Sequence, residues 1–252
     1  MADIASPPVA PLDRGNALAS DTAMVLAAGL GKRMRPLTAS RPKPMVVVAG
    51  KPLIDHALDR LAEAGVARAV VNAHYLADAM EAHVMQRAAP EVQISDERDL
   101  LLETGGGMVK AQSLLPDPFF CLNSDSLWLD GPRNLFRELS LAWRPDEMDA
   151  LLLVARHRNA HNYIGNGDFH LDPLGLIQRR RPDRVAPFIY TGIQLVSHRL
   201  LRDAPQGPFS TNVLWSRAIA ERRLYGLVHT GEWFEVGTPG DIAPTEDWLA
   251  RA

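Results

Sequence analysis

The sequence is poor in the features that mark several large classes of protein. It has one cysteine in 252 residues, Cys121, so no disulfide can form within the chain. No apolar run approaches the roughly 20 residues that a membrane-spanning helix needs, and the first residues lack the charged and apolar segments of an export signal. We therefore expect a cytoplasmic protein with no membrane partner.

Excess positive charge and metal-binding spacings are missing as well. Lys and Arg number 27 against 30 Asp and Glu, a net charge of −3, which argues against a nucleic acid partner. The eight histidines show no zinc-ligand spacing. Cys121 lies in the apolar run 119–122, which favours a buried strand residue over a reactive thiol.

The hydrophobic content of 46% is ordinary for a folded domain with a substantial core. Residues 1–20 contain Pro7, Pro8 and Pro11 and show little apolar periodicity, which predicts a disordered or loosely attached leader. We expect the remaining residues, 21–252, to form a single domain. The sequence leaves the oligomeric state open.

The order of apolar runs and helical patterns in the first half predicts a parallel sheet. Strands are expected at residues 23–28, 67–73 and 92–95, with helices from 53 to a cap at Gly65 and over 76–88. Pro52 suits the first position of the first helix. A βαβαβ order of this kind is typical of α/β proteins.

The second half continues this pattern with a polar interruption at residues 156–187, where we expect antiparallel β pieces outside the main sheet. Thr104 is expected to cap a helix that runs to residue 114. The closing segment should begin a helix with Thr238 as its cap and Pro239 in its first position. Further strands are predicted at 119–122, 150–155, 190–196, 224–229 and 233–236, and further helices at 135–142 and 212–222.

A loop rich in glycine and positive charge follows the first predicted strand. Residues 26–43 read LAAGLGKRMRPLTASRPK, with Gly29 and Gly31 placed where the strand should open onto a ligand crevice. Glycines let backbone amides approach an anion closely. The loop lacks the third glycine of a dinucleotide-binding fingerprint and does not match a P-loop. It therefore predicts a cradle for a polyphosphate.

The string LAAGLGKRMRPLT followed by Pro42-Lys43-Pro44 resembles the sugar-1-phosphate nucleotidyltransferases. Residues 103–107, ETGGG, and 123–125, NSD, match two further patterns of that family, with serine in place of the family's glycine at 124. The resemblance implies the nucleotide-diphospho-sugar transferase fold. That fold is α/β, with a Rossmann-like, mostly parallel mixed sheet flanked by helices and a small antiparallel β subregion over the sugar site.

The resemblance also implies a reaction and a set of site residues. The phosphate of a sugar 1-phosphate would attack the α-phosphorus of a nucleoside triphosphate, with Mg²⁺ as cofactor and Arg33, Lys43 and Asp125 as catalytic residues. Asp125 and Glu235 would hold the metal, and Asn123, Asp168 and Thr191 would contact the sugar phosphate. The residues implied for nucleotide binding are Ala28, Gly29, Gly31, Lys32, Arg33, Lys43, Glu103, Gly105 and Gly106.

Glu235 departs from the family pattern, which has aspartate before V-G-T. Glutamate can bind Mg²⁺ through oxygen but is one methylene longer; alternatively, Glu235 stabilises the start of the following helix. We expect this segment to lie along the same sheet as residues 103–107 and 123–125. The run Arg179-Arg180-Arg181 could reach the sugar phosphate, but a run of like charge is usually a solvated face, which is what we expect here.

Within the family, the short length, LETGGG and the segment GNGDF at 165–169 most resemble the uridylyltransferases of N-acetylmuramate 1-phosphate, so UTP is the favoured nucleotide. Two alternatives use the same chemistry: glucose 1-phosphate with dTTP, and mannose 1-phosphate with GTP. A catalytically silent nucleotide-sugar binding protein is a further alternative, which the intact loop argues against.

Overall fold

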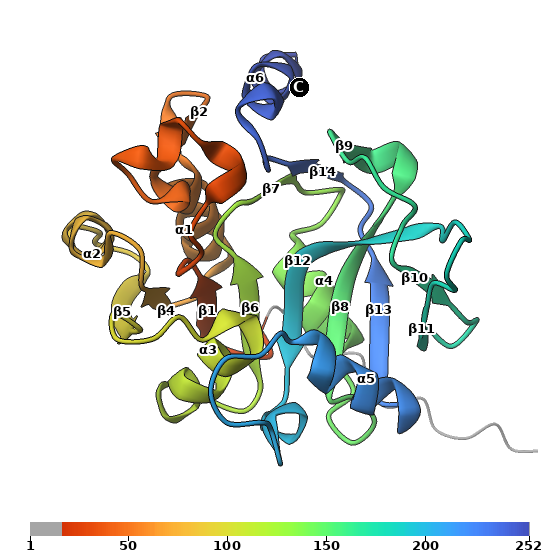
Figure 1. The fold of residues 1–252 in the computed structure, drawn as a ribbon. Helices are drawn as coiled ribbons and strands as arrows, with labels where there is room; N and C mark the ends of the chain where they lie inside the picture. Colours follow the sequence, from red (N-terminus) through yellow and green to blue (C-terminus); the bar gives the residue numbers. More distant parts are fainter. Residues whose placement is uncertain (1–16, 252) are drawn as a thin grey trace, which may run out of the picture.

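A nine-stranded sheet runs through the computed structural model, which describes residues 17–251 (Figure 1). Its main path runs β5-β4-β1-β6-β12-β8-β13, and the hairpin β10–β11 pairs with the start of β12. The strands are β1 (Thr22–Leu26), β4 (Arg68–Ala73), β5 (Glu91–Asp96), β6 (Phe119–Asn123), β8 (Ala150–Arg156), β10 (Phe169–Leu171), β11 (Ile177–Arg179), β12 (Phe188–Val196) and β13 (Leu224–Val228).

The sheet is mixed but mostly parallel, as predicted. Strands β5, β4, β1 and β6 are parallel to one another, and β13 is parallel to β8. Strand β12 runs against its neighbours β6 and β8, and the hairpin strand β10 runs against both β11 and β12. Leu26 at the end of β1 pairs with Asn123 at the end of β6. The carboxyl ends of these strands therefore meet at one edge, which is where open α/β sheets bind ligands.

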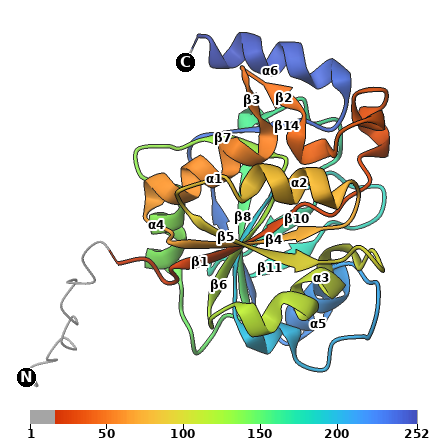
Figure 2. The same ribbon diagram turned by 90° about the vertical axis from the view of Figure 1, so that its left-hand side faces the viewer.

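Helices cover both faces of the sheet (Figure 2). Side chains alternate along each strand, so that in β1 Ala23 and Val25 pack in one buried cluster and Met24 packs in another. The first cluster includes residues of α1 (Leu53–Ala64), α2 (Ala77–Val84) and α4 (Leu135–Ala142). The second includes residues of α3 (Glu103–Ala111) and α5 (Asn212–Ala220).

A third buried cluster lies beyond the carboxyl edge of the sheet. It joins Met34 of the glycine loop to Phe234 and Val236, and Trp248 packs against it. These residues belong to or flank a three-stranded sheet, β7-β14-β9, a two-stranded sheet, β2-β3, and the last helix. Their bounds are β7 (Ser126–Leu129), β9 (Ala160–His161), β14 (Glu232–Glu235), β2 (Val47–Val48), β3 (Lys51–Pro52) and α6 (Ile242–Leu249).

Short 3₁₀ turns complete the chain. Thr238 precedes the last of them and Pro239 begins it, as predicted, and the carboxylate of Asp241 accepts hydrogen bonds from the amides of Gly237 and Thr238. The turns are η1 (Lys32–Met34), η2 (Leu37–Ala39), η3 (Lys43–Met45), η4 (Gln112–Leu114), η5 (His157–Asn159), η6 (His198–Leu201) and η7 (Pro239–Asp241).

Two expectations about helix starts are wrong. Pro52 precedes α1 instead of occupying its first position. Thr104 lies inside α3, which begins at Glu103, and its hydroxyl accepts a hydrogen bond from the amide of Thr211. Thr104 therefore ties α3 to the segment before α5 through a long-range hydrogen bond instead of capping its own helix.

Two expectations about strand placement are also wrong. The hairpin β10–β11 in the polar stretch is continuous with the main sheet through the pairing of Phe169 with Phe188. Glu235, expected on the main sheet, lies on β14 in the smaller sheet and pairs with Ser126. Loop 123–126 turns from β6 into β7, so the two sheets meet there.

Part of the predicted leader is attached to the domain. The amide of Ala19 donates to Ser140 Oγ, 2.9 Å away, Leu18 and Ala19 pack against the core, and Ser20 is buried. Residues 1–16 lie outside the described residues, so the prediction for them stays a prediction. Among residues 17–251, no helix has the length and apolar character to cross a membrane.

Two titratable side chains, Cys121 and Asp149, are buried in or beside the main sheet. Cys121 is buried in β6 as predicted, and burial raises the pKa of its thiol to about 12. Asp149 is 4% exposed, and its Oδ1 accepts hydrogen bonds from Arg199 Nε at 3.0 Å and Arg223 Nε at 2.6 Å. These ion pairs join the start of β8 to the segments after β12 and before β13.

We expect Asp149→Asn to lower the free energy of unfolding by about 2 kcal/mol, because it leaves two guanidinium groups without their carboxylate while keeping its size. The arginine side chains are 30% and 28% exposed, which reduces the cost. Urea unfolding measures the change in the free energy of unfolding. Glu63→Gln, in the exposed pair with Arg60, is the control and should change stability by no more than ~0.5 kcal/mol. Equal effects of both variants would contradict the assignment.

Candidate active site

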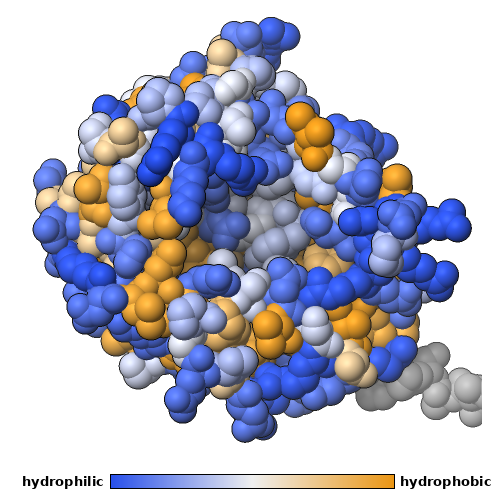
Figure 3. Space-filling model, in the orientation of Figure 1, coloured by the Kyte–Doolittle hydropathy of each residue, from blue (hydrophilic) through white to orange (hydrophobic). Residues whose placement is uncertain are grey.

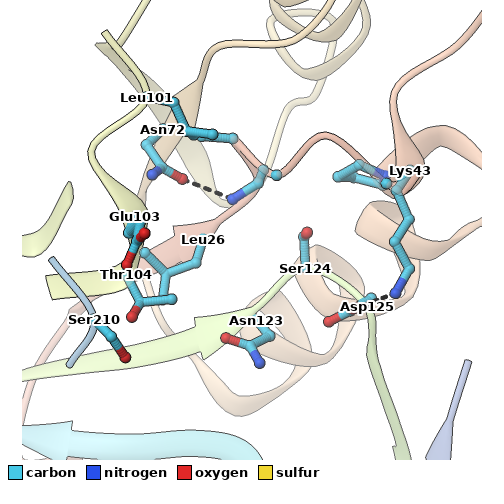
Figure 4. A pocket seen from close by; sticks show the side chains of 15 residues that line it. Leu26, Lys43, Asn72, Leu101, Glu103, Thr104, Asn123, Ser124, Asp125 and Ser210 are labelled. Carbon is cyan, nitrogen blue, oxygen red and sulfur yellow. Dashed lines mark hydrogen bonds and ion pairs between the residues drawn. The ribbon is translucent and has the colours of Figure 1, made fainter. Parts of the chain in front are cut away.

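The carboxyl edge of the main sheet is hollowed, and the hollow is visible near the centre of the face in Figure 3. A cavity of about 390 Å³, here called the first cavity, opens there. Figure 4 shows Asn72, Leu101, Glu103 and Thr104 on one side of it and Lys43 on the other. Its lining residues are Leu26, Ala27, Ala28, Gly29, Gly31, Lys43, Pro44, Asn72, Leu101, Glu103, Thr104, Asn123, Ser124, Asp125 and Ser210.

Two further cavities adjoin the first. The second cavity, of about 190 Å³, lies between the main sheet and the smaller sheet and includes Asp168, Thr191 and Glu235 in its lining. The third cavity, of about 430 Å³, lies along the glycine loop and is lined by Lys32 and Arg33 among others. Lys43 lines all three cavities. Asn123 and Asp125 line both the first and the second.

Gly31 brings Lys43 to this junction. Its φ of +58° is a left-handed conformation that favours glycine. A Cβ at Gly31 would lie 2.9 Å from Lys43 Cβ and 3.0 Å from Thr38 Cγ2, and the Thr38 hydroxyl donates to the carbonyl of Gly31. Gly29 differs, because a Cβ there would have no protein atom within 4 Å and would point into open space.

Lys43 and Asp125 meet across the wall between the first and second cavities. Lys43 Nζ lies 2.5 Å from Asp125 Oδ2, and the lysine side chain is 14% exposed (Figure 4). Asp125 follows β6, where the amide of Ser124 donates to the carbonyl of Leu26 on β1. The backbone at Ser124 does not have positive φ, so serine fits where the family pattern has glycine.

Arg33 and Glu235 face each other at the rim of the second cavity. Arg33 Nη1 lies 3.7 Å from Glu235 Oε1, with side chains 71% and 31% exposed. Their chain neighbours Met34 and Phe234 are fully buried in the third cluster. This packing fixes the backbone at Arg33 and Glu235, whose charged groups reach the cavity. The pair is loose enough for either group to meet a ligand.

Comparisons with known proteins agree with this geometry. Residues 22–165 match the family model described as nucleotidyl transferase. The chain is 44% identical over 235 residues to the N-acetylmuramate alpha-1-phosphate uridylyltransferase of Caulobacter vibrioides, covering 91% of this chain and 97% of that one. The chain belongs to the nucleotidyl transferase family.

Other members and a solved structure fit the same assignment. The protein of Neisseria meningitidis serogroup B with the same name is 34% identical, over 86% of this nucleotidyl transferase and 93% of its own length. The inositol-1-phosphate CTP transferase of T. maritima superposes with a TM-score of 0.74 at 19% identity, over 92% and 96% of the two chains. The latter likeness shows the shared fold.

Asn72 and Glu97 support the first cavity of this nucleotidyl transferase. Asn72 Oδ1 accepts a hydrogen bond from the amide of Ala27, 2.6 Å away, and Asn72 Nδ2 donates to the buried carboxylate of Glu97 at 2.7 Å. Glu97 also accepts from the amide of Leu102. Residue-pattern reasoning missed Glu97, since an acidic residue after a short strand resembles a solvated loop residue.

The three glycines of α3 are in close contact with neighbouring segments of the chain. A Cβ at Gly105 would lie 2.3 Å from the Phe209 ring, and one at Gly106 would lie 2.5 Å from the Gly207 carbonyl oxygen. The amides of Gly105 and Gly106 both donate to the carbonyl of Phe209. Gly105 and Gly106 do not line the first cavity, whereas Glu103 does. Their role in nucleotide binding therefore stays a prediction.

Most other predicted site residues do converge. Ala28, Gly29, Gly31, Lys43 and Glu103 line the first cavity, whereas Lys32 and Arg33 line the third. Ser210, from the segment before α5, also lines the first cavity and was not among the predicted residues, because no motif marks it.

The second cavity brings the three predicted sugar-side residues together. Asn123, Asp168 and Thr191 all line it. Asp168 Oδ2 accepts a hydrogen bond from the amide of Tyr190, and the buried Thr191 donates to the carbonyl of Leu153, so its hydroxyl is already engaged. Tyr163 also lines this cavity, and burial together with the charge of Asp168 raises the pKa of its phenol. Tyr163 is therefore a neutral donor at neutral pH.

The oxygen donors at the junction suit a hard divalent cation. Asp125 and Glu235 line the second cavity together, and each is accompanied by a single cation, Lys43 or Arg33. No group of three or more His, Cys, Asp or Glu side chains that could hold a metal occurs in residues 17–251. Mg²⁺ in phosphate chemistry is held by one or two carboxylates together with substrate phosphates and water, so two carboxylates fit.

The two loop glycines offer a matched pair of variants. Gly31→Ala should lower the free energy of unfolding by roughly 1–3 kcal/mol and displace Lys43, with about a 100-fold loss of activity. Gly29→Ala should keep the stability within ~0.5 kcal/mol, because its methyl group meets no protein atom, and should raise the KM for the nucleotide. Thermal unfolding and steady-state kinetics measure both. Wild-type stability of Gly31→Ala would contradict this account of the loop.

Proposed function

We propose that this nucleotidyl transferase transfers a uridylyl group from UTP to N-acetylmuramate 1-phosphate, giving UDP-N-acetylmuramate and pyrophosphate. The observation that supports transfer is the wall of Lys43, Asn123 and Asp125 shared by the first and second cavities. The choice of sugar and base rests on the names of the relatives at 44% and 34% identity. Such a reaction would return cell-wall muramate to peptidoglycan synthesis in the cytoplasm, where UTP is made.

The reaction needs no protein nucleophile. A phosphate oxygen of the sugar 1-phosphate forms a bond to the α-phosphorus of UTP, and the bond from that phosphorus to the bridging oxygen breaks, releasing pyrophosphate. Both partners are anions, so catalysis depends on position and on positive charge near the transferring group. Lys43 lines all three cavities, so its ammonium would reach either substrate, and Lys32 and Arg33 line the third cavity where the leaving phosphates would lie.

Asp125 and Glu235 are the residues that would hold Mg²⁺. The ion supplies charge neutralisation on the phosphoryl oxygens. Lys43 and Arg33, which pair with these carboxylates, would then be available to the phosphates. Asn123, at the junction, and Asp168, in the second cavity, would orient the sugar phosphate, while Glu103 and the backbone of residues 28–31 would contact the nucleotide.

Pyrophosphate release across a matrix of nucleoside triphosphates and sugar 1-phosphates tests the proposal. The matrix contains UTP, dTTP, GTP and CTP against the 1-phosphates of N-acetylmuramate, N-acetylglucosamine, glucose and mannose, with Mg²⁺. We expect the highest kcat/KM for UTP with N-acetylmuramate 1-phosphate, and loss of turnover with EDTA. Turnover confined to other sugars would overturn the choice of substrate, and no turnover at all would overturn the transferase activity.

Glu235 and Arg33 form one ion pair but are expected to bind different ligands, and two variants can separate these roles. If Glu235 binds Mg²⁺, Glu235→Gln should raise the Mg²⁺ concentration for half-maximal rate at least about tenfold, as expected for loss of a charged ligand. Arg33→Gln breaks the same pair but should leave that midpoint unchanged and raise the KM for UTP. Identical Mg²⁺ midpoints for wild type and Glu235→Gln would remove Glu235 from the metal site.

A further inference from the structure

A fourth cavity, of about 330 Å³, lies beside the second cavity and shares Asp168 and Tyr190 with it. Hairpin β10–β11 and the start of α5 enclose it, on the right of the molecule in Figure 1. The remaining lining residues are Gly167, Phe169, Arg179, Arg180, Asn212 and Trp215. A short substituent on a sugar in the second cavity would extend past the shared wall into this space.

Arg179 is held in the fourth cavity by neutral groups. Its Nη1 donates to Asn212 Oδ1 at 3.0 Å, and its Nη2 donates to the carbonyl of Asn212 and to Ser216 Oγ. The guanidinium carbon lies 5.9 Å from the centre of the Phe169 ring. These contacts fix the orientation of the guanidinium and leave its Nε with no hydrogen-bond partner among residues 17–251.

Arg180, the next residue along the chain, is also oriented by neutral groups, here backbone carbonyls. Its Nε donates to the carbonyl of Gly167, and its Nη1 donates to the carbonyls of Arg181 and Arg184. Its Nη2 donates to no protein oxygen in the described part of the chain. The side chain is half-buried, and its three protein contacts orient the guanidinium while leaving Nη2 to donate to a ligand.

No carboxylate within 4.0 Å neutralises either arginine in residues 17–251. Asp168 is the one acidic residue in the lining of the fourth cavity, and the amide of Tyr190 occupies its Oδ2. Two guanidinium groups against one carboxylate leave the cavity with a net positive charge. Fixed guanidinium groups with free N–H donors match the two oxygens of a carboxylate in charge and geometry.

We propose that the fourth cavity binds a carboxylate carried by the sugar substrate, with Arg179 and Arg180 as the specificity-determining residues. The inference rests on the proposed function, because N-acetylmuramate is N-acetylglucosamine with a lactyl ether that ends in a carboxylate. The phosphate and the acetamido group are common to both sugars, so only the lactyl carboxylate distinguishes them by charge. A site that pairs this charge would reject the neutral sugar.

The ratio of kcat/KM for two substrates tests carboxylate recognition by Arg179 and Arg180 more sharply than activity on one substrate does. The probes are N-acetylmuramate 1-phosphate and its carboxamide, in which the lactyl carboxylate is replaced by a neutral amide of nearly the same size. Wild type should favour the acid. Arg180→Gln and Arg179→Gln should each lower the ratio of the two kcat/KM values by roughly 10- to 100-fold, the loss expected for a charged hydrogen bond, with little change for the carboxamide.

Arg184→Gln is the matched control. It removes the same charge from the exposed loop beside Arg180. Arg180 contacts the backbone carbonyl of Arg184, which the substitution keeps. Its selectivity ratio should equal that of wild type. A purely structural role of Arg179 and Arg180 would lower kcat/KM for both probes in parallel. Parallel losses, or an unchanged ratio in both arginine variants, would overturn the proposal.

The inference and the proposed function can fail separately. If wild type turns over neither probe with UTP, the proposed function fails by that result alone. Calorimetric binding of the same two sugar phosphates to wild type and Arg180→Gln then tests the cavity directly. Weaker binding of the acid by the variant supports the carboxylate site, and equal binding of acid and carboxamide by wild type overturns it.

Discussion

Lys43 is held at the junction of three cavities by contacts from two directions. The left-handed turn at Gly31 allows the glycine loop to approach the lysine stem, and Asp125 pairs with the ammonium. A single cation therefore lines all three cavities, and under the proposed function it would reach both the nucleotide and the sugar phosphate. Because two anionic substrates repel each other, this shared charge is the constraint that the surrounding architecture serves.

The central fold could be predicted because its residues carry strong local signals. The predicted run 150–155 is buried on both faces, and Gly65 ends α1 as a left-handed cap. Pairing between distant segments could not be predicted. Phe169 joins its hairpin to β12, and Glu235 joins Ser126 on a separate sheet. Periodicity gives the faces of a strand but carries no information about its partner.

Some residues of the candidate site could likewise be predicted from the sequence, and others could not. Gly29 could be chosen from its place after the first strand, whereas Lys43 and Asp125 could be chosen because they fall in motifs that resemble those of the family. Glu97 was missed because its role comes from burial against Asn72, which only the packed structure shows. The glycines of α3 illustrate a different problem, since close packing against Phe209 and close approach to a ligand favour the same residue.

The third buried cluster connects the rim of the second cavity to the last helix. Met34, Phe234 and Val236 share it with side chains of α6, so the glycine loop, β14 and the last helix are packed as one unit outside the main sheet. A substitution that weakens the packing of α6 would therefore also loosen β14 and the glycine loop. Arg33 and Glu235 would leave the cavity rim together in that event, which links entry and exit at the site to the stability of a helix far along the chain.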